Sequence, residues 1–225
     1  MLEIQGLVAG YGHIDAVSDV TLHLDRGEAV CLLGMNGAGK TTIVKALAGW
    51  LRPSAGHVLL DGRDITRTPS WERTHRGLAV VPEGGRVFRD LSVEENLKIG
   101  KSTQWQRGYD LFPLLYERRR QVAGSLSGGQ RQMLSLSRAL ATEPKYLILD
   151  EISFGLMPTI TNGIFERLED LRSQNIGLLV IEQEERRALA FCDRGYVLAQ
   201  GTLVAEGRSD DLAKDQQVRR AYLGE

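Results

Sequence analysis

The chain has 225 residues, of which 42% are hydrophobic, and this is enough for one domain with a substantial core. Its formal net charge is -1, so it carries no basic excess with which to hold nucleic acid. No apolar run approaches the roughly 20 residues of a membrane span, and we expect any membrane role to come through a partner. The two cysteines, Cys31 and Cys192, stand in apolar surroundings and are expected to be reduced core residues of a cytoplasmic protein.

The front third of the chain is expected to form short strands around one helix. Apolar segments bounded by turn residues predict strands over 2–8, 19–33 and 58–60, with a hairpin-type turn at Arg26-Gly27. An apolar-periodic segment predicts a helix over 43–50. We therefore expect antiparallel strands beside this helix.

The stretch Gly34-Met35-Asn36-Gly37-Ala38-Gly39-Lys40-Thr41-Thr42 fits the pattern G-x-x-x-x-G-K-[ST] of a phosphate loop. Its glycines let the backbone curl with N–H groups inward, and the helix that follows adds its positive end. The loop therefore predicts a nest for the phosphates of a nucleotide. Lys40 is expected to reach the β- and γ-phosphates, and the Thr41 hydroxyl to bind Mg²⁺. The alternative, a plain glycine-rich turn, is disfavoured because strand, loop and helix follow in the required order.

The middle of the chain, about 84–142, has little strand pattern and predicts a helical insertion. Ser92 with Glu95 fits a capping box that opens a helix, and residues 105–123 carry further helical patterning. After this insertion, strands alternate with helices, which argues for a parallel α/β core. The expected strands are 78–81, 146–149 and 177–181, and the expected helices are 158–173 and 184–192. Residues 195–199 and 202–205 are expected to form a closing hairpin.

Two carboxylates, Asp150 and Glu151, follow the apolar run Tyr146–Leu149. At the carboxyl end of a buried strand both acids are expected to face a nucleotide crevice. Asp150 suits the shell of Mg²⁺, and Glu151 suits positioning and deprotonating an attacking water. Two solvated acids at a strand end are the alternative, which the phosphate loop upstream makes less attractive.

A second glycine-rich helix start is the stretch Leu126-Ser127-Gly128-Gly129-Gln130. Ser127 fits a simple helix cap. A serine followed by two glycines at a helix start is also an anion site, because it offers bare N–H groups, a hydroxyl and a positive helix end. A second phosphate nest in one chain suggests closure over a nucleotide that is held elsewhere.

In order and spacing these motifs resemble those of ATP-binding-cassette (ABC) ATPases. Residues 34–42 are similar to the Walker A motif, 146–151 to Walker B and 126–130 to the signature motif. The resemblance covers nearly the whole chain and implies a single ABC ATPase domain, 1–225, of the α/β class. Its implied parts are a P-loop NTPase core with a mixed or parallel sheet, an antiparallel β subdomain and the inserted helical subdomain.

The resemblance also implies a site for ATP and Mg²⁺ that two chains share. Tyr11 matches the aromatic residue on which adenine stacks, whereas taken alone it fits local packing at a strand end. In a head-to-tail dimer, each ATP would lie between Walker A of one chain and Ser127, Gly129 and Gln130 of the other. The implied contacts from Walker A are Gly34, Asn36, Gly37, Ala38, Gly39, Lys40, Thr41 and Thr42.

Further stretches resemble the ATPase subunits of branched-chain amino-acid importers: 81–88, 91–97, 181–183 and 221–224. Such subunits lie on the cytoplasmic face of the membrane, usually paired with a sister ATPase beneath two permeases. An extracytoplasmic binding protein delivers the substrate to them. Importers of urea or short amides carry similar ATPases, and a non-transport ABC ATPase is a further alternative. We expect no nucleic-acid partner.

Two positions depart from the general ABC pattern, which has glutamine in place of Glu83 and histidine in place of Gln183. The amide of Gln183 can donate a hydrogen bond to a γ-phosphate but carries no charge in any state. Glu83 adds negative charge near Mg²⁺ and can contact the metal only as an anionic ligand. We therefore expect the isolated chain to hydrolyse ATP slowly. The importer subfamily often shares both departures.

Overall fold

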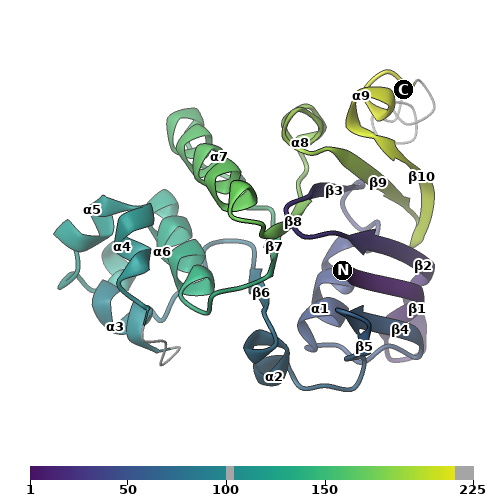
Figure 1. Cartoon of the computed structure of the whole chain (residues 1–225), viewed down its shortest axis with the longest axis horizontal. Helices are drawn as coiled ribbons and strands as arrows, with labels where there is room; N and C mark the ends of the chain where they lie inside the picture. The colour runs from purple at the N-terminus through teal and green to yellow at the C-terminus, as the bar shows by residue number, and fades with distance from the viewer. Residues whose placement is uncertain (100–103, 216–225) are drawn as a thin grey trace.

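The computed structural model describes residues 1–99 and 104–215, and two sheets organise them (Figure 1). The first sheet is antiparallel and has four strands in the order β2-β1-β4-β5. Its strands are β1 (Leu2–Tyr11), β2 (Ile14–Leu24), β4 (Ala55–Leu60) and β5 (Arg63–Asp64). The expectation of antiparallel strands near the phosphate loop is confirmed.

The second sheet has six strands in the order β10-β9-β3-β8-β7-β6. Neighbours from β9 to β6 run parallel, and only β9 and β10 pair antiparallel, as the predicted closing hairpin requires. The strands are β3 (Ala29–Leu33), β6 (Leu78–Val81), β7 (Tyr146–Asp150), β8 (Gly177–Ile181), β9 (Arg194–Ala199) and β10 (Thr202–Arg208). The α/β class with a mixed sheet is therefore confirmed.

The predicted hairpin at Arg26-Gly27 is wrong, because β2 and β3 belong to different sheets. β2 pairs with β1, whereas β3 pairs with β8 and β9. At this turn the chain crosses from the antiparallel sheet to the parallel one. The segment 19–33 thus contains the end of one strand and the whole of another, and β2 begins five residues earlier, at Ile14.

Helix α1 (Lys40–Ala48) packs between the two sheets. The fully buried β3 serves both faces of its sheet, as expected for a central parallel strand. Val30 and Leu32 join the core around α1 and the antiparallel sheet, while Cys31 and Leu33 join a second core on the opposite face. Cys31 and Cys192 are both buried and free, as predicted.

Between β6 and β7 the described chain is helical, and Figure 1 shows these helices grouped on one side of the molecule. The predicted capping box is present, because Ser92 Oγ accepts from the Glu95 amide and Glu95 Oε2 accepts from the Ser92 amide. The helices are α3 (Val93–Lys98), α4 (Arg107–Leu111), α5 (Pro113–Glu117), a 3-10 turn (Ala123–Ser125) and α6 (Gly128–Leu140). The boundaries of the insertion stay a prediction.

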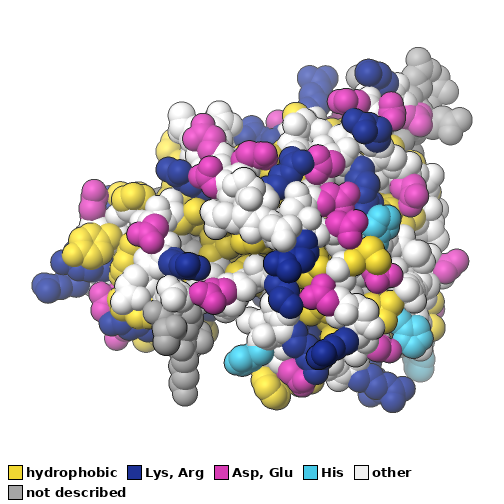
Figure 2. All heavy atoms as spheres, viewed as in Figure 1, with side chains coloured by type: hydrophobic (Ala, Val, Ile, Leu, Met, Phe, Trp, Pro, Cys, Tyr) yellow, Lys and Arg dark blue, Asp and Glu magenta, His cyan; other side chains and the backbone are white. Residues whose placement is uncertain are grey.

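The remaining helices are α2 (Ser70–His75), α7 (Pro158–Ser173), α8 (Glu185–Phe191) and α9 (Ser209–Leu212). In the part of the chain that the structure describes, none of the helices combines the length and apolar character needed to cross a membrane. Figure 2 shows acidic and basic side chains interspersed over the viewed face. The segment 221–224, which contributes to the resemblance, lies outside the described residues.

Candidate nucleotide-binding and hydrolysis site

In the loop between β3 and α1, the backbone at Gly39 has a conformation and surroundings that only glycine fits. Its φ is 111°, and an added Cβ would lie 2.5 Å from Val17 Cγ1 and 2.9 Å from the Ala16 carbonyl oxygen. Helix α1 begins at Lys40, three residues earlier than predicted, and no side chain caps it. The first turn therefore presents backbone N–H groups and the positive end of the helix dipole, which is the arrangement that binds phosphate.

Lys40 is 5% exposed and lies across this loop. Its Nζ donates hydrogen bonds to the backbone oxygens of Gly34 and Met35, and lies 3.9 Å from Glu151 Oε1. Burial lowers the pKa of Lys40, and the nearby carboxylates oppose that shift. The ammonium group thus stands between the phosphate loop and the acids at the end of β7.

The two predicted acids follow directly from the sheet topology. β3, β8 and β7 are parallel neighbours, so their carboxyl ends meet at one edge. Asp150 ends β7 and is 5% exposed. Burial raises the pKa of Asp150 to about 6, with further contributions from Glu151 and Glu83, while Lys40 and Arg86 act against the shift. A buried carboxylate of this kind is stabilised as an anion when a cation is bound beside it.

Glu151 is held in an unusual conformation beside Gln183. Its φ is 49°, in the left-handed region, and its amide donates to the Ile181 carbonyl oxygen at 2.8 Å. Gln183 Nε2 donates to Glu151 Oε2 at 2.7 Å. The predicted base and the residue that replaces histidine are therefore in direct contact.

The predicted magnesium ligands supply oxygen atoms, which Mg²⁺ prefers. Thr41 is exposed in the first turn of α1, and Glu83 is exposed just after β6, which neighbours β7. Within residues 1–99 and 104–215, no group of three or more His, Cys, Asp or Glu side chains could hold a metal. The residues fit a cation that is shared with a nucleotide's phosphates, with Thr41 and Asp150 as the protein's donors.

Tyr11 lies where β1 turns into β2, next to α1. Tyr11 is 50% exposed, and Lys45 of α1 donates from Nζ to the phenol oxygen at 3.0 Å. That hydrogen bond is the main reason that the pKa of Tyr11 is lowered. An exposed aromatic face within reach of the phosphate-loop helix suits a base that stacks on it.

The signature residues lie apart from this loop, since Figure 1 shows α6 on the far side of β6 and β7 from α1. Ser127 and Gln130 form a capping box of their own: Ser127 Oγ accepts from the Gln130 amide, and Gln130 Oε1 accepts from the Ser127 amide at 3.0 Å. Gly129 is buried against α7, where an added Cβ would lie 2.8 Å from Ile160 Cδ1. One chain thus brings together the Walker residues and keeps the signature residues separate.

Sequence reasoning missed two residues beside this site. Glu182 is 1% exposed, directly precedes Gln183, and accepts two hydrogen bonds from Ser153. An acid directly after a buried strand is the signal that could have drawn attention to Glu182. No comparable signal marks Ser153, because its partner is 29 residues away in the sequence.

The fold and the site define an ATP-binding cassette. The family model described as "ABC transporter" matches residues 17–153, and the chain belongs to this family. It is an ATPase of the transport class. The chain also aligns with a nucleotide-free ATP-binding cassette from an ABC transporter with a TM-score of 0.89 at 26% identity, covering 100% of this chain and 99% of the other.

Among curated relatives, BraG of Pseudomonas aeruginosa, a high-affinity branched-chain amino acid transport ATP-binding protein, is 41% identical over 232 residues, covering 100% of both chains. LptB of Haemophilus influenzae, a lipopolysaccharide export system ATP-binding protein, is 35% identical and covers 100% of this chain and 98% of its own length. The resemblance to ABC ATPases is therefore confirmed, while these two relatives serve different transport systems.

Proposed function

We propose that the chain is the ATP-hydrolysing subunit of an ABC importer that takes up branched-chain amino acids. The observation that carries the proposal is the 41% identity with BraG over the full length of both proteins. LptB, at 35% identity, makes glycolipid export the second candidate. Import of urea or short amides remains the alternative within the importer class.

Uptake in the source organism tests the substrate. Replacing the chromosomal copy by a Glu151→Gln variant should abolish energy-dependent uptake of leucine, isoleucine and valine, because the base is lost while the fold is kept. Export of surface glycolipid should be unchanged. Normal amino-acid uptake with failed glycolipid export would instead favour the second candidate, and loss of urea uptake alone would favour the third.

In the proposed chemistry, Glu151 accepts the proton of the water that attacks the γ-phosphate. Lys40 and the amide of Gln183 donate to the phosphate oxygens, on which negative charge develops. Mg²⁺, held through Thr41 and Asp150 with Glu83 nearby, would neutralise charge on the phosphates. The contacts of Glu151 with Lys40, 3.9 Å away, and with Gln183 support this grouping.

The site is proposed to be completed by a second ATPase chain, either identical or a sister subunit, arranged head to tail. That chain would contribute Ser127, Gly129 and Gln130 across the nucleotide. Two exposed apolar side chains near the site, Phe154 and Met157, each 64% exposed, support a protein surface that is covered in an assembly. Size-exclusion chromatography of the Glu151→Gln variant with ATP, alone and with a sister chain, tests the pairing.

Gln183 is proposed to limit hydrolysis by the isolated chain. A Gln183→His variant should turn over ATP about 5- to 10-fold faster, because imidazolium adds charge to the donor facing the γ-phosphate. Steady-state phosphate release at pH 6.5 and 8.5 measures the effect, which should be larger at the lower pH. Equal rates for both proteins at both values would contradict the limiting role, as would a wild-type chain that alone matches the rate of the intact transporter.

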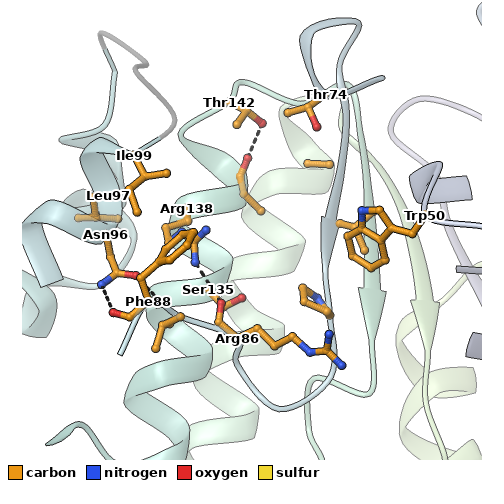
Figure 3. A pocket seen from close by; sticks show the side chains of 15 residues that line it. Trp50, Thr74, Arg86, Phe88, Asn96, Leu97, Ile99, Ser135, Arg138 and Thr142 are labelled. Carbon is orange, nitrogen blue, oxygen red and sulfur yellow. Dashed lines mark hydrogen bonds between the residues drawn. The ribbon is translucent and has the colours of Figure 1, made fainter. Parts of the chain in front are cut away.

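A groove of about 450 Å³ beside the helical region is proposed to receive a permease (Figure 3). Trp50 lies on one side of it, and Phe88 and Ile99 lie on the other. Among the described residues that line it are two arginines and no carboxylate. The Arg138 guanidinium carbon lies 4.6 Å from the Phe88 ring centroid, and Arg138 donates to the Arg86 backbone oxygen. This lining suits a segment with apolar side chains and an acidic residue.

A docked permease would place the chain on the cytoplasmic face of the membrane, with an extracytoplasmic binding protein acting on the permease's other side. Arg138→Ala should weaken co-purification of the permeases about 10-fold, because the acidic residue loses its partner. Arg167→Ala is the matched control, since Arg167 pairs with Asp170 on the exposed face of α7. Equal retention of permeases by the wild type and the Arg138→Ala variant would refute this docking site.

A further inference from the structure

Glu182 and Ser153 join two loops behind the proposed reaction centre. Glu182 follows β8 and is 1% exposed. Its Oε1 accepts from the Ser153 amide at 3.0 Å, and its Oε2 accepts from Ser153 Oγ at 2.7 Å. Both oxygens of a buried acid are thus used on one residue of the loop that follows β7.

These bonds belong to a set that connects the end of β8 and the two residues after it to the loop that follows β7. The Glu151 amide donates to the Ile181 carbonyl oxygen, Ser153 donates to Glu182, and Gln183 donates to Glu151. Each residue of the segment 181–183 therefore binds the segment 151–153. Because Glu182 is the central residue, its hydrogen bonds fix the position of the backbone from which the Gln183 side chain extends.

The backbone at Glu151 needs such support. Its φ of 49° is a conformation that residues other than glycine rarely adopt, and it persists only where the surroundings impose it. Ser153 lies two residues further along the same loop. Its two hydrogen bonds to Glu182 restrain the chain on the far side of the left-handed residue, while the bond to Ile181 restrains the near side.

We infer that Glu182 and Ser153 are positioning residues that hold the Glu151 carboxylate and the Gln183 amide in their relative places for hydrolysis. This inference rests on the proposed role of Glu151 as the base. Neither residue touches the reacting atoms. They act by keeping the two groups that do so within hydrogen-bond reach of each other, where a small misplacement is costly.

Burying a carboxylate costs desolvation free energy, and joining two loops does not by itself require it. Burial, and to a smaller extent the charge of Glu151, raise the pKa of Glu182, while the hydrogen bonds from Ser153 and the charge of Arg187 act against that shift. Apolar side chains could fill the same space without that cost. Hydrogen bonds are directional, whereas apolar contacts are not. The bonds between Glu182 and Ser153 therefore fix the orientation of the two segments relative to each other.

The test uses the full-length chain, with ATP affinity and the thermal midpoint measured for each variant alone, and KM and kcat measured for each variant in the assembled transporter. Glu151→Gln is the reference for the proposed base. Ser153→Ala removes one of the two hydrogen bonds, and Glu182→Ala removes both. Glu182→Gln keeps both, because its amide oxygen can accept from the Ser153 N–H and its amide nitrogen can donate to Ser153 Oγ. Ser137→Ala is the matched control, since it deletes a buried hydroxyl that donates to the Gly108 carbonyl oxygen in the helical region.

We expect kcat to fall about 5-fold in Ser153→Ala and about 50-fold in Glu182→Ala, with KM and ATP affinity within about twofold of wild type. Glu182→Gln should restore kcat to within about threefold of wild type. Ser137→Ala should lower the thermal midpoint and leave kcat unchanged. This split between kcat and KM, with rescue by the amide, separates positioning from a loss of stability.

Three results would overturn the inference: unchanged kcat in Ser153→Ala, a rise in KM at constant kcat, or a Glu182→Gln variant as slow as Glu182→Ala. If Glu182→Ala does not fold, Ser153→Ala and Glu182→Gln still decide the question. The proposed base fails separately, if Glu151→Gln hydrolyses ATP like the wild type. A loss of hydrolysis in Glu151→Gln together with normal Ser153→Ala would leave the proposed function in place and refute the positioning role.

Discussion

The starts of α1 and α6 are both glycine-rich, yet they are built in opposite ways. Helix α1 has no side-chain cap and is preceded by Gly39 in the left-handed region. Helix α6 is capped by Ser127, whose backbone is extended, and its first turn is closed by the reciprocal bonds of Ser127 and Gln130. Neither helix has an acidic residue in its first turn, but the first residue of α1, Lys40, lies 3.9 Å from the carboxylate of Glu151.

The difference shows what each helix start can do on its own. The α1 start leaves backbone donors for a ligand and places Lys40 beside them, so we expect a single chain to bind phosphate. The α6 start satisfies two of its own donors with side chains. It is stable without a ligand, and a phosphate presented by another chain must compete with, or be added to, the existing bonds.

The largest expected effects distinguish ATP binding by one chain from ATP hydrolysis by the dimer. Lys40→Ala should weaken ATP binding by an isolated chain at least about 100-fold, because the buried ammonium has no substitute among the loop's N–H groups. Ser127→Ala should leave that affinity within about twofold and lower hydrolysis by the assembled dimer about 100-fold. Equilibrium dialysis with labelled ATP and phosphate release from the dimer measure the two. Equal losses of monomer affinity in both variants would erase the distinction between the helix starts.

The second comparison replaces one glycine in each motif by alanine. Gly39→Ala should lower the free energy of unfolding by about 3 kcal/mol, because its Cβ would collide with Val17 and the Ala16 carbonyl in a left-handed backbone. Gly128→Ala should raise it by about 0.5 kcal/mol, since its Cβ meets only Leu156 Cδ2, at 3.9 Å. Urea unfolding of the nucleotide-free chain gives both values. A Gly128→Ala variant as unstable as Gly39→Ala would show that both turns demand glycine for their backbone.

The contrast also explains which features the sequence could predict. The phosphate loop was predictable because its backbone requirement is written locally, in the glycines between an apolar strand and an apolar-periodic helix. Helix α7 was predicted over its whole length, 158–173, since Pro158 starts it and its apolar spacing continues to Leu171. The capping box at Ser92 is equally local. Such features need only residues within a few positions of one another.

Features that depend on distant partners were missed. The crossing at Arg26-Gly27 looked like a hairpin, because nothing nearby reveals that β3 pairs with β8 and β9. The pair of Glu182 with Ser153 exists only once β7 and β8 are neighbours. The motif residues could be placed from the sequence, but the contact between Gln183 and Glu151 could not.

Charge at the α1 site gives a pH-dependent prediction. The pKa of Asp150 rises from an ordinary 3.8 to about 6 in the folded chain, so the folded state binds the extra proton between these values. The contribution of Asp150 to the free energy of unfolding should therefore fall as pH rises from about 4 to about 6, by about 3 kcal/mol. Asp150→Asn should be more stable than the wild type at pH 7.5 by that amount and equal to it near pH 4, in urea unfolding with EDTA present.

Asp61 offers the control with the opposite sign. Burial raises its pKa, but hydrogen bonds from Tyr146, the N-terminal amine and Lys145 outweigh burial and lower it to about 2. Asp61→Asn should therefore destabilise the chain at pH 7.5, by about 1 kcal/mol after allowance for solvent screening. That loss should disappear as pH falls from about 4 to 2. If Asp150→Asn lowered the free energy of unfolding at pH 7.5, the ionised carboxylate of Asp150 would not be destabilising the folded chain.

Substitutions at Ser127 separate two possible roles of this residue, which are to cap α6 and to contact the nucleotide of a partner chain. Ser127→Ala should lower the free energy of unfolding by about 1 kcal/mol, while Ser127→Asp should be neutral, because aspartate caps a helix as well as serine does. If Ser127 contacts a phosphate, Ser127→Asp should instead lose hydrolysis in the dimer, since its carboxylate would repel the γ-phosphate. A Ser127→Asp chain that is stable, binds ATP alone and fails to hydrolyse it in the dimer would show that the serine is retained for its partner's nucleotide. A Ser127→Asp dimer that hydrolyses ATP at the wild-type rate would show that the cap of α6 is only a cap.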